Sequence, residues 1–292
     1  MSRRWKAALK LSAGRKGSYV LRLETDKGWL LVTHPDHAHL AGEFASQWGN
    51  EMFAPPEPRE HVLRGVYRHD DGWRGRDIQP AVTQQGKPAA FSAELVGAYS
   101  AFEEIDLAAY LAVRREAVQL IAQEDAYAAI LISMHTHDLL SERADRSTIR
   151  PEQLPWLDAF LVEQMSLQRA LLEQLQEAGT IAAEAFTAET FQRNFQLLQA
   201  CDNLSLLSCV DFGGEATLLH PLALRNGGTS EVRVERTGER AFRLTPYPLA
   251  SSKLVFGLKA RFVEGKRFAD AAQLKSLLDE APFQQLDVTI TA

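Results

Sequence analysis

Cysteine is scarce in this sequence, and its scarcity excludes two classes of protein. Cys201 and Cys209 are the only cysteines among 292 residues, too few for a scaffold stabilised by disulfides. They do not form a Cys-x-x-Cys pair, which excludes a zinc-finger type of site. Both fall in one predicted helix, about 12 Å apart along its axis, so we expect two free thiols.

Long apolar runs and an excess of positive charge are also missing. No run of about 18 apolar residues occurs, so the sequence predicts no membrane-spanning helix. The basic N-terminus lacks the apolar segment of a signal peptide. The net charge of −6 provides no general attraction for nucleic acid or anionic lipid. These features predict a cytoplasmic protein whose partner is a small molecule rather than nucleic acid or a membrane.

Helical periodicity fills most of the region between residues 34 and 212. Apolar residues recur there every three or four positions, and proline and glycine separate the segments. The intervening residues 72–92 are rich in glycine, proline and charge, and they predict a long loop. The apolar face of residues 152–178 is typical of a bundle core or of a homodimer interface. The predicted helices are 34–48, 59–71, 103–123, 124–140, 152–178 and 187–209.

Strand-like patterns lie at both ends of the chain. Residues 18–33 alternate polar and apolar side chains around a turn at 26–28, which predicts a β-hairpin. After residue 213, turns separate β-rich runs and one helix (268–280); the runs are 216–224, 231–236, 241–244, 253–262 and 286–291. We therefore predict a mainly α fold. A helical domain spans 34–212, and the hairpin (1–33) and residues 213–292 form a small β-rich subdomain that packs on it.

Polar residues interrupt the apolar face of three predicted helices. They are His37 in the first, the adjacent pair His69 and Asp70 at the end of the second, and Asp202 in the last. Burying an unpaired carboxylate costs several kcal/mol, so it needs a cation or hydrogen-bond donors. Histidine nitrogen and carboxylate oxygen are ligands for Mn, Fe, Co, Ni, Zn or Mg. The pattern predicts a site for a divalent metal ion; hydrogen-bonded core histidines and an Asp–Arg pair are the alternative.

The order of these residues resembles the H…HD…D ligand order of the HD-domain superfamily. Its members are all-helical and mostly metal-dependent phosphohydrolases. The resemblance implies an HD-like helical core holding one or two ions, with helices inserted before Asp202. In members with two ions, further histidines hold the second ion, and His135 is the candidate here. The alternative for His135 is a core residue or a hydrogen-bond donor to a ligand.

Other segments resemble the bacterial family known as domain of unknown function 3891. The resemblance extends from about residue 18 to beyond residue 250 and implies no activity. The segments that carry it are Trp29–Gly42, His69–Trp73, Ser133–His135 and Cys201–Leu206.

Two residues after the His-Asp pair are candidates for catalysis. Asp77 fits a general base, or a partner for a nearby arginine. Arg74 fits a clamp for a phosphate through forked hydrogen bonds, or an exposed loop residue. His34 fits a surface or helix-start position.

These residues lead to a functional hypothesis with two alternatives. A metal ion lowers the pKa of a bound water and polarises a phosphoryl oxygen. The sequence therefore predicts a metal-dependent phosphohydrolase of a phosphate mono- or diester, with nucleotides among the candidate substrates. A non-catalytic scaffold that binds a small ligand or partner is the first alternative, and a di-iron oxygenase is the second.

Overall fold

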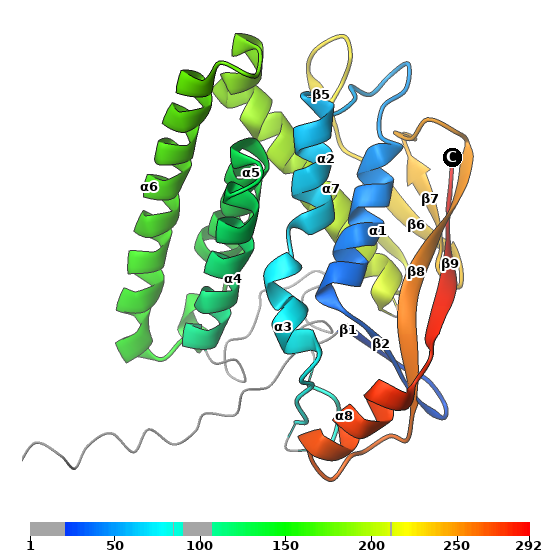
Figure 1. The fold of residues 1–292 in the computed structure, drawn as a ribbon. Coiled ribbons are helices and arrows are strands. Elements are labelled where there is room, and N and C mark those ends of the chain that lie inside the picture. The colour runs from blue at the N-terminus through cyan, green and yellow to red at the C-terminus, as the bar shows by residue number, and fades with distance from the viewer. Residues whose placement is uncertain (1–20, 84, 90–106, 211) are drawn as a thin grey trace, which may run out of the picture.

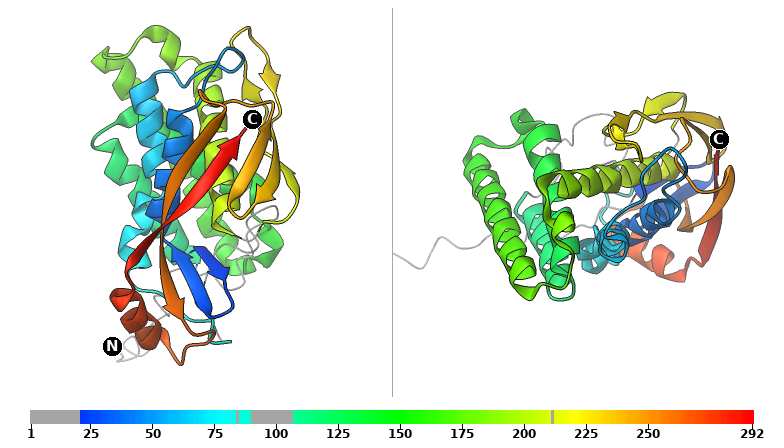
Figure 2. Two further views of the ribbon diagram at one scale, coloured as in Figure 1. Left: turned by 90° about the vertical axis from the view of Figure 1, so that its right-hand side faces the viewer. Right: turned by 90° about the horizontal axis from the view of Figure 1, so that it is seen from above.

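The computed structural model describes residues 21–83, 85–89, 107–210 and 212–292. Helices fill the middle of the chain, and strands from both ends form one large sheet beside them (Figure 1). Seen from above, the sheet lies on one side and α6 (Leu154–Ala178) on the opposite side, with the other long helices between them (Figure 2).

Local sequence signals set the ends of the helices. Helix α1 (His34–Ser46) begins where the Thr33 side chain accepts a hydrogen bond from the backbone N–H of Asp36, with proline in its first turn. Helix α6 ends at Gly179, whose φ of 59° disfavours other residues. The predicted helices are confirmed to within a few residues, although 103–106 lie outside the described residues. Besides α1 and α6, the observed long helices are α2 (Arg59–Arg68), α4 (Leu107–Ala122), α5 (Ala126–Asp138) and α7 (Ala188–Cys209).

The prediction of one long loop at 72–92 is wrong in its first part. The chain instead forms a 3-10 turn, η1 (Asp71–Trp73), and a short helix, α3 (Arg74–Asp77). A Cβ atom at Gly72 would lie 2.4 Å from the carbonyl oxygen of Val113, so η1 packs directly on the backbone of α4. This close contact brings the end of α2 against α4. Further short turns are η2 (Leu139–Arg143, π-helical), η3 (Arg146–Thr148), η4 (Pro151–Gln153) and η5 (Ala183–Phe186).

The sheet has seven strands in the order β1-β2-β8-β9-β7-β6-β3. The predicted hairpin forms β1 and β2, and β2 pairs with β8 in antiparallel register, with Leu30 opposite Phe262. All pairs are antiparallel except β7 with β9. A separate two-stranded ribbon pairs β4 with β5. The strands are β1 (Leu21–Glu24), β2 (Gly28–Val32), β3 (Glu215–Thr217), β4 (Leu222–Ala223), β5 (Thr229–Ser230), β6 (Arg233–Gly238), β7 (Ala241–Thr245), β8 (Lys253–Glu264) and β9 (Phe283–Thr291), with α8 (Ala271–Glu280) between the last two.

The prediction of a mainly α, HD-like bundle is wrong, because the fold is mixed α/β. Strands far apart in sequence join into one seven-stranded sheet, so the β part is a full layer of the protein rather than a small attachment. One hydrophobic core includes Phe44 of α1, Leu204 of α7 and Phe256 of β8. The rings of Phe44 and Phe256 meet edge to face at 4.8 Å. The sheet therefore supports α1, the helix that carries His37.

A second glycine brings the first two helices together. A Cβ atom at Gly42 would lie 2.2 Å from the ring of Tyr67, so α1 and α2 pack closely only with glycine there. Cys201 and Cys209 are both buried and free, as predicted. Within the described ranges, no helix has the length and apolar character needed to span a membrane.

Candidate metal centre

His69 is the residue most clearly prepared to bind a cation. It follows the last turn of α2, is fully buried, and has its ring Nδ1 2.8 Å from the carbonyl oxygen of Val66. A carbonyl only accepts, so Nδ1 carries the proton and donates it, and Nε2 of the neutral ring holds a lone pair. Nε2 has no hydrogen-bond partner. A buried nitrogen without a partner is costly, and a metal ion would satisfy it.

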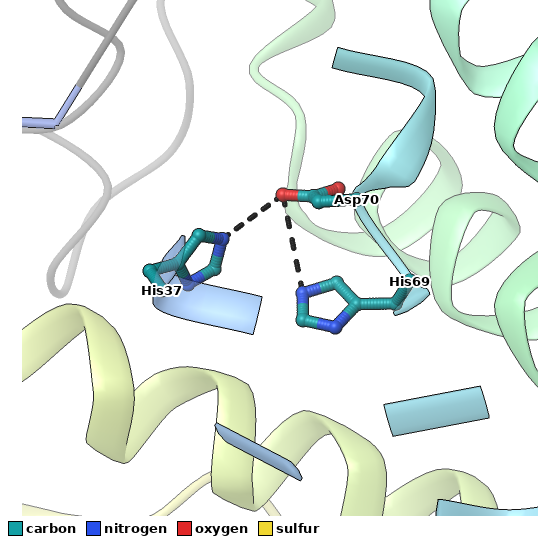
Figure 3. A group of neighbouring side chains, drawn as sticks. All are labelled: His37, His69 and Asp70. Carbon is teal, nitrogen blue, oxygen red and sulfur yellow. Dashed lines mark hydrogen bonds and ion pairs between the residues drawn. The ribbon is translucent and has the colours of Figure 1, made fainter. Parts of the chain in front are cut away.

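His37 is held in the same way from α7. Its Nδ1 lies 2.9 Å from the hydroxyl oxygen of Ser205. That hydroxyl donates to the carbonyl oxygen of Asp202 at 2.8 Å and so accepts from His37 Nδ1. Nε2 of His37 lies 3.0 Å from Oδ2 of Asp70 and donates a hydrogen bond to it when it carries a proton (Figure 3). A metal ion that takes the place of this proton would bind both atoms. Two ligand atoms about 2.1 Å from one ion and about 90° apart are separated by about 3.0 Å, so this spacing fits a shared cation.

Asp202 of α7 links His69 to the fifth candidate, His135. Its Oδ1 lies 3.3 Å from Nε2 of His69, and its Oδ2 lies 3.9 Å from Nε2 of His135. His135 is buried on α5, and its Nδ1 also lacks a hydrogen-bond partner. The structure therefore brings together all five residues predicted as metal ligands. They form two groups whose ligand atoms lie within 4.8 Å of one another: His37, His69, Asp70, and His69, His135, Asp202.

Burial and charge act in opposite directions on the histidines. Burial lowers the pKa of His37 despite its two neighbouring carboxylates, and it lowers the pKa of His135 to about 3. Burial also opposes a charge on His69, but Asp70 and Asp202 together raise its pKa to about 9. His37 and His135 are thus neutral, as metal ligands must be, while His69 attracts a cation of some kind, a proton or a metal ion.

Both carboxylates are ionised. Burial would raise the pKa of Asp70, but Arg114 and His69 hold it well below its usual range. Burial opposes ionisation of Asp202 too, yet His69 brings its pKa to about 2. Two buried negative charges face one permanent cation, Arg114, so the centre lacks one positive charge when its histidines are neutral. The donor set, its charge and the partnerless nitrogen of His69 all fit a divalent ion.

Arg114 is a member of this site that we did not identify from the sequence. It lies on α4, is 6% exposed, and donates from Nη1 to Oδ1 of Asp70. Its Nε donates to the hydroxyl of Tyr110 at 3.1 Å. The sequence held a usable signal, a charged residue on the apolar face of a helix. Arg114 lies four residues from both Tyr110 and Val118 on that face of α4, and His37 likewise interrupts the apolar face of α1. Ser205 was likewise missed.

The two residues proposed for catalysis lie beside the centre rather than in it. Oδ2 of Asp77 accepts from the backbone N–H of His34 at 2.7 Å, and Oδ1 lies 3.0 Å from Nδ1 of the same residue. His34 does begin α1, but it is buried and stacks on Trp73 with the ring centres 4.4 Å apart. Arg74 is largely exposed and donates to Asp71 at 3.0 Å. Catalytic roles for Asp77 and Arg74 stay predictions.

Comparison with known proteins identifies a family and no activity. A family model described as "Protein of unknown function (DUF3891)" matches residues 20–265. No curated protein and no solved structure matches the chain.

Proposed function

This chain belongs to the DUF3891 family, whose description gives no activity, and from the site itself we propose that the protein is a metal-dependent phosphohydrolase. Its substrate is a phosphate mono- or diester. The observation that carries the proposal is the buried Nε2 of His69. It meets no hydrogen-bond geometry and lies within reach of the ionised Asp70 and Asp202 and of a second histidine nitrogen.

Four side chains would hold the ion. They are His37 and His69 through Nε2 and Asp70 through Oδ2, which form one group, and Asp202 through Oδ1, which lies 3.3 Å from Nε2 of His69. A bound divalent ion supplies Lewis acidity, which lowers the pKa of a coordinated water and polarises a phosphoryl oxygen.

The remaining residues of the chain keep these ligands in place. The Val66 carbonyl and the Ser205 hydroxyl each accept a proton donated by one histidine ring, which fixes its orientation and leaves Nε2 available. Arg114 holds Asp70 by its other oxygen. The burial of all these groups excludes bulk water, so their electrostatic interactions are stronger than at the surface.

The charge of the loaded centre supports an anionic substrate. Asp70 and Asp202 contribute two negative charges, Arg114 one positive charge and a divalent ion two, so the sum is +1. A buried positive centre attracts a phosphate ester more strongly than a neutral molecule.

Metal content and phosphatase activity together test the proposal. Protein purified without chelator, loaded with Mn²⁺ and dialysed, is compared with His69→Ala and with the control His39→Ala, which changes an exposed histidine of α1. We expect bound metal and Mn²⁺-dependent hydrolysis of p-nitrophenyl phosphate or its bis ester in the wild type and the control, and neither in His69→Ala. Wild-type protein that binds no metal, or metal binding that survives in His69→Ala, would overturn the proposal.

A further inference from the structure

We propose that the centre holds a single divalent ion and that Arg114 serves as its second cation, binding the phosphoryl oxygens of the substrate beside that ion. This inference rests on the proposed function and specifies how the substrate is recognised. It follows from three observations: the number of ligand atoms available, the partners of Asp70, and the surroundings of Arg114.

The count of ligand atoms allows one ion. Both groups of candidate ligands depend on His69. Its Nδ1 is committed to the Val66 carbonyl, so only Nε2 is available, and one nitrogen lone pair binds one ion. Once that nitrogen and Oδ1 of Asp202 bind the first ion, the second group retains only His135 and the other oxygen of Asp202, Oδ2. Metal sites in proteins usually have at least three protein ligands, and the described part of the chain offers no further group.

Asp70 shows where a second cation would otherwise lie. A carboxylate that bridges two ions uses one oxygen for each. Oδ2 of Asp70 faces His37 Nε2, but Oδ1 accepts a hydrogen bond from Nη1 of Arg114. The guanidinium therefore occupies the position on Asp70 that a second ion would take, and it contributes a permanent charge.

Arg114 is held rigidly enough to act as a fixed donor. Besides its bonds to Asp70 and Tyr110, its guanidinium carbon lies 5.2 Å from the centre of the Tyr110 ring and 5.7 Å from that of Trp73. The hydrogen bonds of Arg114 to described residues come from Nε and Nη1, so Nη2 donates to none of them. The two N–H groups of Nη2 are therefore available to a phosphoryl oxygen, and a permanently charged, planar guanidinium is a common partner of phosphate. Its orientation is already set, so little conformational entropy is lost when an anion binds.

The experiment measures metal stoichiometry and phosphate binding on the full chain. Mn²⁺ per chain is determined by equilibrium dialysis and elemental analysis, and inorganic phosphate is then titrated calorimetrically into the Mn²⁺-loaded protein. The variants are Arg114→Met, which removes the charge, and Arg114→Lys, which keeps the charge but loses the planar fork. The control is Arg115→Met, because the neighbouring Arg115 pairs with Glu163 at the surface.

We expect one Mn²⁺ per wild-type chain and phosphate binding that Arg115→Met leaves unchanged. Arg114→Met should weaken phosphate binding about ten- to a hundredfold. The phosphate affinity of Arg114→Lys should lie between those of the wild type and Arg114→Met. If Arg114→Met does not fold, the phosphate affinity of Arg114→Lys is compared with that of the wild type, and a weaker affinity in the variant is the expected result. Two Mn²⁺ per wild-type chain, or unchanged phosphate affinity in the folded Arg114 variants, would overturn this inference while leaving the metal-dependent function in place. A failure to bind Mn²⁺ at all would overturn both.

Discussion

The ring Nε2 of His69 lies 3.3 Å from Oδ1 of Asp202, and the two form an ion pair when His69 is protonated. His69 follows the last turn of α2, Asp202 lies on α7, and both side chains are buried. The pair is therefore arranged for a cation between its members, and the first predictions concern which cation is there.

In the metal-free protein, the cation at His69 is a proton. Its pKa is about 9 in the folded protein and about 6.5 in the unfolded chain. This raised pKa stabilises the fold fully below pH 6.5, and the stabilisation is lost as the pH rises through 9. We expect chelator-treated protein to lose about 3 kcal/mol of unfolding free energy between pH 6.5 and 9.

Denaturant unfolding at several pH values measures this loss. His69→Gln should remove the dependence, whereas His39→Gln, at an exposed position, should retain it. A stability that stays constant or rises over this pH range in the metal-free wild type would show that His69 is not held in the charged form.

A bound metal ion should replace that proton. The ion competes with the proton for Nε2 of His69, so its affinity increases as the pH rises toward 9. We expect the rise in Tm caused by Mn²⁺ to be larger at pH 8.5 than at pH 6.5. Thermal unfolding with and without the ion measures it, and an equal shift at both pH values would count against ligation by His69.

The orientation of His37 should depend on Ser205. Removing the hydroxyl in Ser205→Ala leaves Nδ1 of His37 without its acceptor, so we expect a loss of about 10- to 100-fold in metal affinity. Ser208→Ala is the matched control, because Ser208 is also buried on α7 but donates only to the backbone of Leu204. Titration with Mn²⁺ compares them. Equal affinities in both variants would mean that the hydroxyl does not position the ligand.

The contact of η1 with α4 should tolerate only glycine at position 72. Gly72→Ala places a methyl group 2.4 Å from the carbonyl oxygen of Val113, so we expect a destabilisation of about 1–3 kcal/mol. Gly75→Ala is the control, since a methyl group there contacts nothing within 4 Å. Chemical denaturation measures both. Similar stabilities for the two variants would contradict the close packing that brings Arg114 to Asp70.

The helices and the five residues that cluster in the candidate centre were predictable because their signals are local; their role as metal ligands stays a prediction. Proline at position 35 and glycine at 179 mark helix ends within a few residues, and His37 and Asp202 stand out on apolar helix faces. The sheet was underestimated because β2 and β8 pair across more than two hundred residues, and no local pattern specifies that partner. Arg114 was missed because a long cationic side chain in a helix is usually solvated, and only the position of Asp70 shows what it pairs with.

The most direct test of a single metal ion in this centre is anomalous diffraction from crystals grown with Mn²⁺. The account predicts one anomalous peak per chain, bonded to His37 Nε2, His69 Nε2, Asp70 Oδ2 and Asp202 Oδ1, with Arg114 still on the other oxygen of Asp70. A fully occupied data set with no peak between these residues, or with two peaks there, would contradict it.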